Sequence, residues 1–159
     1  MGKNYSPQIA AEVNSFLEGD DWHFSFDEDR GIFRFNLSIK GRMKSISYIV
    51  DIKDDAYIVY AISPISGDQD DAEMMAQLAE FITRANYGLK NGCFEMDFND
   101  GEIRYRIFVD CEDQLPTNQI IKNSIYVTAA TFSRYSEGIL DIVFGGATGK
   151  DACAKCEAD

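Results

Sequence analysis

The stretch ISYIVDIKDDAYIVYAIS, residues 46–63, decides the fold of this chain. Its first half alternates apolar and polar side chains with the period of a half-buried β-strand. Asp54 and Asp55 then mark a turn, and a second strand follows over residues 57–63. Both faces of this second strand are apolar. They consist of Tyr57, Val59 and Ala61 on one side and Ile58, Tyr60 and Ile62 on the other. We therefore expect the strand to be covered on both sides, by packed elements or by another subunit.

Further strands extend from this stretch in both directions. Upstream, residues 33–39 alternate apolar and polar side chains, and a shorter alternation covers residues 22–26. Downstream, residues 94–98 and residues 103–109 alternate on either side of Asn99-Asp100-Gly101, a sequence typical of a hairpin turn. Together with the opening stretch, these segments predict six strands in two groups.

Helical spacing of apolar residues separates and flanks these groups. Apolar side chains recur every three or four positions over residues 7–19, 71–88 and 118–145. The residues expected to cap these helices at their N-termini are Ser6, Asp70 and Thr117. Gly138 lies inside the last and longest helix, where a glycine favours a bend.

The predicted order is therefore helix, four strands, helix, two strands, helix. Strand hairpins joined by helices, without strict alternation of strand and helix, indicate an α+β fold. We expect a mostly antiparallel sheet with helices packed on one face, forming a single domain over residues 1–146. The small and polar residues 147–159 predict a flexible C-terminal tail.

Composition restricts the function classes. The 159 residues include 27 acidic and 15 basic side chains, giving a net charge of −12 that argues against nucleic acid or an anionic membrane as the main partner. No apolar run approaches the ~18 residues that a membrane-spanning helix needs. The N-terminal residues lack the basic and apolar pattern of a secretory signal, so a cytoplasmic location is expected.

The sharpest local motif is Cys153-Ala154-Lys155-Cys156. Cysteines at this spacing can share a zinc ion or form a redox pair. A closed zinc site needs four ligands, and the remaining candidates are Cys93, Cys111 and the single histidine, His23. Two interpretations stay open: incidental thiols in a tail, or a thiol- or zinc-dependent switch using Cys153 and Cys156. Under the first, no metal, cofactor or catalytic residue is expected.

Charge is unevenly distributed along the chain. Residues 30–53 contain one acid, Asp51, and six basic side chains: Arg30, Arg34, Lys40, Arg42, Lys44 and Lys53. This segment carries +5, and since the whole chain carries −12, the remainder carries −17. One interpretation is a solvated hairpin with edge-protecting lysines. The other is a basic ribbon that meets an acidic partner, which includes the acidic remainder of a second copy. The predicted interaction surface combines Arg34, Arg42 and Lys44 of this ribbon with Ile58, Val59, Tyr60 and Ile62 of the strand whose two faces are apolar.

These features extend over residues 7–146 and resemble a known family. They are the short opening helix with Phe16-Leu17, the segment Trp22–Phe26, the meander Phe33–Ile62, the helix ending at Gly88, the hairpin Phe94–Val109 and the long helix closing at Ile142-Val143-Phe144-Gly145. In this pattern the chain resembles the YbjN family, small bacterial proteins described as sensory transduction regulators with a type III secretion chaperone-like fold. The resemblance implies a non-enzymatic homodimer that acts through protein–protein contacts, with a protein client or regulatory partner.

Overall fold

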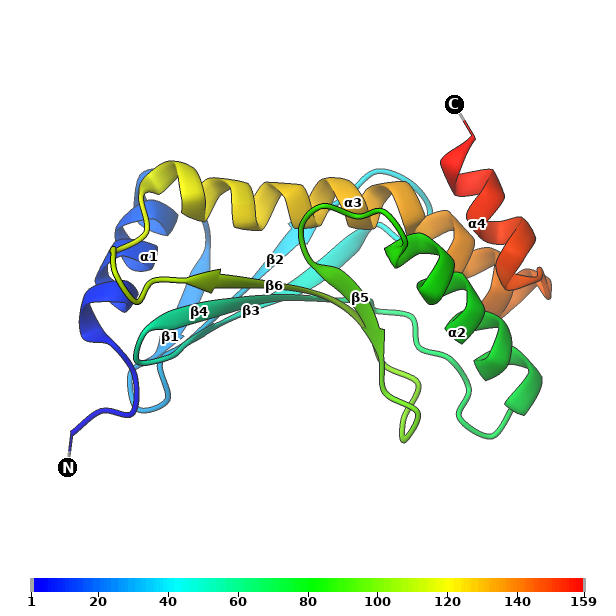
Figure 1. Ribbon diagram of the computed structural model, residues 1–159, viewed down its shortest axis with the longest axis horizontal. Helices are drawn as coiled ribbons and strands as arrows, with labels where there is room; N and C mark the ends of the chain where they lie inside the picture. The colour runs from blue at the N-terminus through cyan, green and yellow to red at the C-terminus, as the bar shows by residue number, and fades with distance from the viewer. Residues whose placement is uncertain (1, 159) are drawn as a thin grey trace.

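The computed structural model describes residues 2–158, which form an α+β fold with one six-stranded antiparallel sheet and four helices (Figure 1). This confirms the predicted fold class and the order of the first nine elements. In chain order the elements are α1 Pro7–Gly19, β1 Phe24–Asp27, β2 Ile32–Ser38, β3 Ser45–Ile52, β4 Ala56–Ile62, α2 Ala72–Asn86, β5 Cys93–Met96, β6 Ile103–Asp110, α3 Asn118–Gly145 and α4 Gly149–Glu157.

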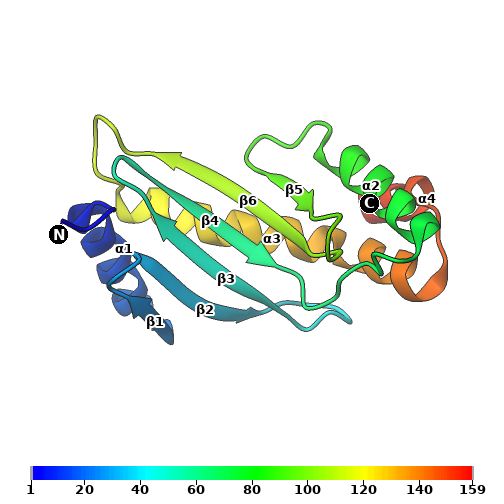
Figure 2. The same ribbon diagram turned by 90° about the horizontal axis from the view of Figure 1, so that it is seen from below.

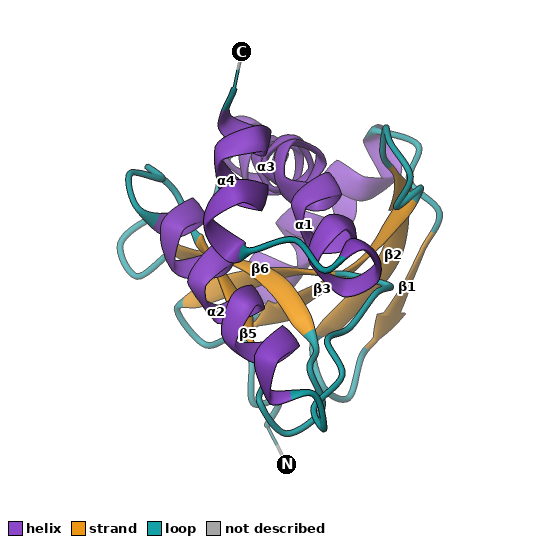
Figure 3. Ribbon diagram, turned by 90° about the vertical axis from the view of Figure 1, so that its right-hand side faces the viewer, coloured by secondary structure: helices purple, strands orange, loops and turns teal. Residues whose placement is uncertain are grey.

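The strands are ordered β1-β2-β3-β4-β6-β5 across the sheet, and every neighbouring pair is antiparallel. The long helix α3 runs along one face of the sheet, with α1 beside its first turns (Figures 1 and 2). Helices α2 and α4 pack against each other and against α3 at the far end of the sheet (Figure 3). No helix of the described chain covers the opposite face, which is turned toward the viewer in Figure 2.

The core lies between the sheet and α3, and it is rich in aromatic side chains. Tyr48 and Tyr57 are fully buried there, because the period of two directs both toward the helices. The Tyr48 hydroxyl donates to the Ile125 carbonyl oxygen at 2.7 Å, and the Tyr57 hydroxyl lies 3.0 Å from that of Ser124. Burial raises the pKa of Tyr57 to about 12, so the phenol stays neutral in the core. These two bonds connect the sheet directly to α3. They also satisfy polar groups that would otherwise be buried without a partner.

Helix α3 continues through Gly138, and the glycine has a packing role there. A Cβ built at Gly138 would lie 2.6 Å from Cζ of Phe81 and 3.0 Å from Sγ of Cys156. The missing side chain therefore allows the Phe81 ring of α2 and the Cys156 thiol of α4 to approach the α3 backbone. Helix α3 ends where Gly146 adopts a left-handed conformation, with φ of 65°.

The prediction of a flexible C-terminal tail is wrong, because residues 149–157 form α4. The Thr148 side chain caps this helix by accepting from the Asp151 backbone N–H. Ala152 and Cys153 are buried against the rest of the molecule, and the Lys155 ammonium donates to the Asp141 carboxylate of α3 at 2.8 Å. The prediction failed because it relied on the small and polar average composition of the segment, although a few apolar residues suffice for docking on existing helices.

Candidate functional site

The candidate site is the face of the sheet that lies opposite α3, which we call the open face. Side chains alternate between the two faces of every strand, so residues next to core positions point toward it. The open face includes Ser25, Asp27, Ile32, Arg34, Asn36, Ser47, Ile49, Asp51, Ile58, Tyr60, Ile62, Cys93, Glu95, Arg104, Arg106, Phe108 and Asp110. Its central strands are β3 and β4, and its flanks are β1–β2 on one side and β6–β5 on the other.

Strand register arranges the open face in rows that cross the sheet. One row runs from Arg34 through Ile49 and Tyr60 to Arg106. The next row places Ile62 between Ser47 and Arg104, and Ile58 lies opposite Phe108 in the row on the other side. The centre of the open face is thus apolar and its flanks carry arginines. Phe108 is 57% exposed, although a large aromatic ring is usually buried.

The arginines of the β6 flank are positioned by two neighbours. The Arg104 guanidinium lies 4.3 Å from the centre of the Tyr60 ring, a cation–π contact. The Arg104 Nε donates to Glu95 Oε1 at 3.0 Å, and the Arg106 Nε lies 3.2 Å from the other oxygen of the same carboxylate. The negative charge of the Glu95 carboxylate is the main cause that raises the pKa of Arg106. One carboxylate therefore faces two guanidinium groups, and these three side chains together carry a charge of +1.

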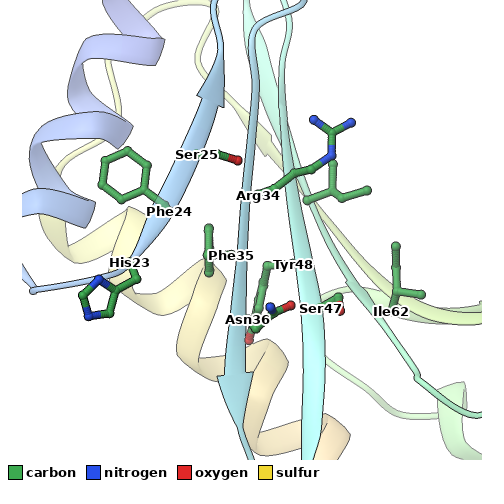
Figure 4. A pocket seen from close by; sticks show the side chains of 10 residues that line it. His23, Phe24, Ser25, Arg34, Phe35, Asn36, Ser47, Tyr48 and Ile62 are labelled. Carbon is green, nitrogen blue, oxygen red and sulfur yellow. The ribbon is translucent and has the colours of Figure 1, made fainter.

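Beside the other flank the surface is hollowed. A shallow depression of about 580 Å³ extends over β1, β2 and β3 toward the end of β4 (Figure 4). Its lining includes Arg34, Asn36, Ser47 and Ile62, with His23 at the start of β1. The depression is open and mixed in polarity, so it suits a side chain of a bound protein better than an enclosed small molecule.

Four of the predicted interaction residues, Arg34, Ile58, Tyr60 and Ile62, lie on the open face. Val59 does not, and its assignment is corrected: it is fully buried against the helices, paired between Val50 and Ile107. Because both faces of β4 are apolar, the sequence alone could not distinguish the covered face from the open one.

Arg42 and Lys44 lie apart from the open face, in the turn between β2 and β3. The Arg42 guanidinium contacts Glu137 at 2.6 Å and Asp141 at 2.7 Å, both on α3. Hydrogen bonds from the Arg42 backbone N–H and guanidinium lower the pKa of the Glu137 carboxyl. Arg42 thus anchors the hairpin to α3, while Lys44 is exposed with φ of 72°. The structure therefore does not bring these two residues together with Arg34.

Sequence reasoning missed the β6 flank of the site. Arg104 and Arg106 alternate with the core residues Ile103, Tyr105 and Ile107, which was a readable signal that both arginines share one face. No sequence signal showed that β6 lies beside β4, because that neighbourhood requires β5 and β6 to join the edge of the earlier meander.

All four cysteines are free thiols; Cys111 and Cys153 are buried, and Cys93 and Cys156 are partly buried. Cys153 is 3% exposed, and burial raises the pKa of its thiol to about 11. Burial also raises the pKa of Cys156. Cys93 lies on β5 and Cys111 directly follows β6, so neither belongs to α4. Within residues 2–158 no group of three or more histidine, cysteine or acidic side chains is arranged to hold a metal ion. The arrangement gives no specific support to a thiol- or zinc-dependent switch.

Cys153 is expected to react with iodoacetamide at pH 8 about 100-fold more slowly in the native protein than in the unfolded chain. A pKa raised by about two pH units lowers the thiolate fraction by that factor, and burial slows access further. Timed labelling followed by peptide mass spectrometry measures each cysteine separately, with denatured protein as the control. Equal rates in the two states would show that α4 does not shield the thiol.

Comparison with known proteins adds no assignment: no family model, curated protein or solved structure matches this chain. Among the residues that the structure describes, no helix combines the length and the apolar character needed to cross a membrane.

Proposed function

We propose that this protein is a non-enzymatic protein–protein interaction module, regulatory or chaperone-like, that acts as a homodimer in the bacterial cytoplasm. The observation that carries the proposal is the open face, where an uncovered sheet presents an apolar centre between arginines. The resemblance to the YbjN family points in the same direction, since it implies a dimeric protein that works through protein contacts.

The composition of the open face supports binding of a protein surface. An antiparallel sheet with one solvated face normally directs polar side chains toward water. Here Ile49, Ile58, Tyr60 and Ile62 are adjacent on that face, and each is only partly buried. A contiguous apolar patch with a polar rim is typical of a protein-binding site, because burying it against a partner removes apolar area from water.

A second copy fits the outer side of α3. Ile120, Asn123, Val127 and Ala130 form one exposed stripe on this helix at helical spacing, and Ile120 and Val127 are 41% and 39% exposed. No acidic residue occurs between positions 114 and 136 of the sequence. Two copies that each carry −12 repel one another, so contact through the segment without acids has the lowest electrostatic cost. We therefore assign the second copy to this stripe and the partner protein to the open face.

The variant Val127→Asp is expected to convert the dimer to a monomer in native mass spectrometry and light scattering. It places two like charges close together in an apolar contact, while the exposed position leaves the fold intact. The control is Ala76→Asp, an exposed position on α2 outside both surfaces, which should remain dimeric. A wild-type protein that is monomeric at micromolar concentration would contradict the homodimer.

The variant Tyr60→Asp tests the open face as the partner site. It should stay folded and dimeric, yet lose proteins that copurify with the wild-type chain from the source cells. Quantitative mass spectrometry compares it with wild type and with Ala76→Asp, which should retain them. Unchanged copurification with Tyr60→Asp would overturn the assignment of the open face.

A further inference from the structure

We propose that the partner bound on the open face is an acidic protein segment, whose carboxylates contact Arg34 on one flank and Arg104 and Arg106 on the other while apolar side chains cover the centre. This inference rests on the proposed function and specifies the chemistry of the partner. Three observations carry it: two guanidinium groups that share one carboxylate, the spacing of the arginines across the sheet, and the sign of the charge in the two central rows of this face.

The guanidinium groups of the β6 flank are held in place but are not saturated. Arg104 and Arg106 both direct Nε toward Glu95, so the two guanidinium groups share one carboxylate. The Arg106 Nε is buried and makes no well-directed hydrogen bond, despite its 3.2 Å distance from Glu95. Contact with the Tyr60 ring fixes Arg104. A guanidinium fork that is oriented before binding loses little side-chain entropy when a carboxylate arrives.

On the opposite flank, Arg34 is exposed, and no acid within residues 2–158 forms an ion pair with it. It lies in the same cross-strand row as Arg106, with Ile49 and Tyr60 between them. Three strand spacings separate the two positions, which corresponds to about 14 Å. The row therefore presents positive, apolar, apolar and positive groups in sequence, and its complement is an apolar segment with carboxylates at both ends.

The sign of the charge selects between partners. In the two central rows, those of Tyr60 and Ile62, three arginines face the single carboxylate of Glu95. The other acids of the open face are Asp27, Asp51 and Asp110, which lie outside these rows; Asp51 pairs with Lys53 at 2.7 Å and Asp27 pairs with Arg30. These two rows are thus positive on a protein of net charge −12. Stacking it on the same face of a second copy would bring arginines together, which is unfavourable. A nucleic acid would meet the negative field of the whole molecule. A protein segment with both acidic and apolar side chains supplies carboxylates for the arginines and apolar groups for the centre.

The inference is tested by fluorescence anisotropy with a labelled peptide of about a dozen residues in which Glu and Leu alternate. Two matched peptides carry Gln or Lys in place of Glu. We expect the Glu peptide to bind the full chain at least about tenfold more tightly than the Gln peptide, and the Lys peptide to bind most weakly. Equal affinity for the Glu and Gln peptides, or no binding of the Glu peptide, would overturn the proposal.

Protein variants locate the contact. Arg34→Gln and Arg106→Gln are each expected to weaken binding of the Glu peptide about five- to tenfold, and added salt should reduce the difference from wild type. The control Arg84→Gln removes a charge on α2 that is paired with Glu80, away from the open face, and should bind like wild type. If all three variants bind the Glu peptide with the same affinity, the peptide binds elsewhere on the protein and the proposal is wrong.

Two further outcomes separate this inference from the proposed function. If Tyr60→Asp loses the cellular partner but the wild-type chain does not bind the Glu peptide, the protein is still an interaction module, and the proposal that its partner is acidic is wrong. A labelled single-stranded oligonucleotide is measured in the same assay. If it binds more tightly than the Glu peptide and loses affinity in Arg34→Gln and Arg106→Gln, the ligand of the open face is nucleic acid and the acidic protein segment is wrong.

Discussion

Gly138→Val should lower the free energy of unfolding by about 3 kcal/mol and loosen α4 from the rest of the molecule. Even a Cβ at this position would lie 2.6 Å from Cζ of the fully buried Phe81 ring, and Cys156 of α4 lies on the same side. Neither neighbour can withdraw, because both are packed between helices α2, α3 and α4. The cost corresponds to the upper range of overpacking in a close-packed core. Urea denaturation followed by circular dichroism measures it.

The matched control is Gly145→Ala, in the last turn of the same helix, where an added Cβ would meet no atom within 4 Å. It is expected to stabilise the protein by up to about 1 kcal/mol, since alanine favours the helix over glycine. A midpoint for Gly138→Val equal to that of wild type would show that helices α2 and α4 shift without cost, contrary to the packing described above.

Phe132→Ala should cost about 3–5 kcal/mol of unfolding free energy, the range for removing a buried aromatic ring. Phe132 is fully buried on the sheet side of α3. Its ring packs edge-on against Phe94 of β5, which also packs edge-on against Tyr105 of β6. The deletion therefore leaves a cavity where α3 is fastened to the edge of the sheet, and the surrounding rings cannot collapse into it.

Phe144→Ala is the control for this second substitution. The ring of Phe144 lies on the same helix and is 71% exposed, so its removal should change stability by less than about 0.5 kcal/mol. Equilibrium unfolding in urea distinguishes the two variants. A loss below about 1 kcal/mol for Phe132→Ala would mean that the aromatic cluster does not couple the helix to the sheet.

The elements themselves could be predicted because each has a local signal. Alternation over residues 46–63 predicted the β3–β4 hairpin, and Asn99-Asp100-Gly101 predicted the turn between β5 and β6. Capping by Ser6 and Thr117 is confirmed by the hydrogen bonds that both side chains accept. For α2, the capping residue is Asp71 where Asp70 was predicted, a shift of one position between adjacent acids.

The candidate site was only partly predictable, because its assembly depends on contacts between distant segments. Alternation assigns Val59 and Tyr60 to opposite faces, but it does not say which face α3 covers. Arg42 was predicted to be free for a partner, yet its carboxylate contacts come from Glu137 and Asp141, nearly a hundred positions later in the chain. Local sequence patterns cannot show such pairings, and they also did not show that β6 lies beside β4.

The position of α3 in the chain has a consequence for synthesis. All six strands are complete at Asp110, whereas the helix that covers their core face extends to Gly145. A ribosome that adds 5–20 residues per second needs about 2 to 7 s for that interval. During this time the nascent sheet exposes apolar residues on both faces, including the tyrosines that later bond to Ile125 and Ser124. We expect the emerging chain to depend on shielding by cellular chaperones until α3 arrives.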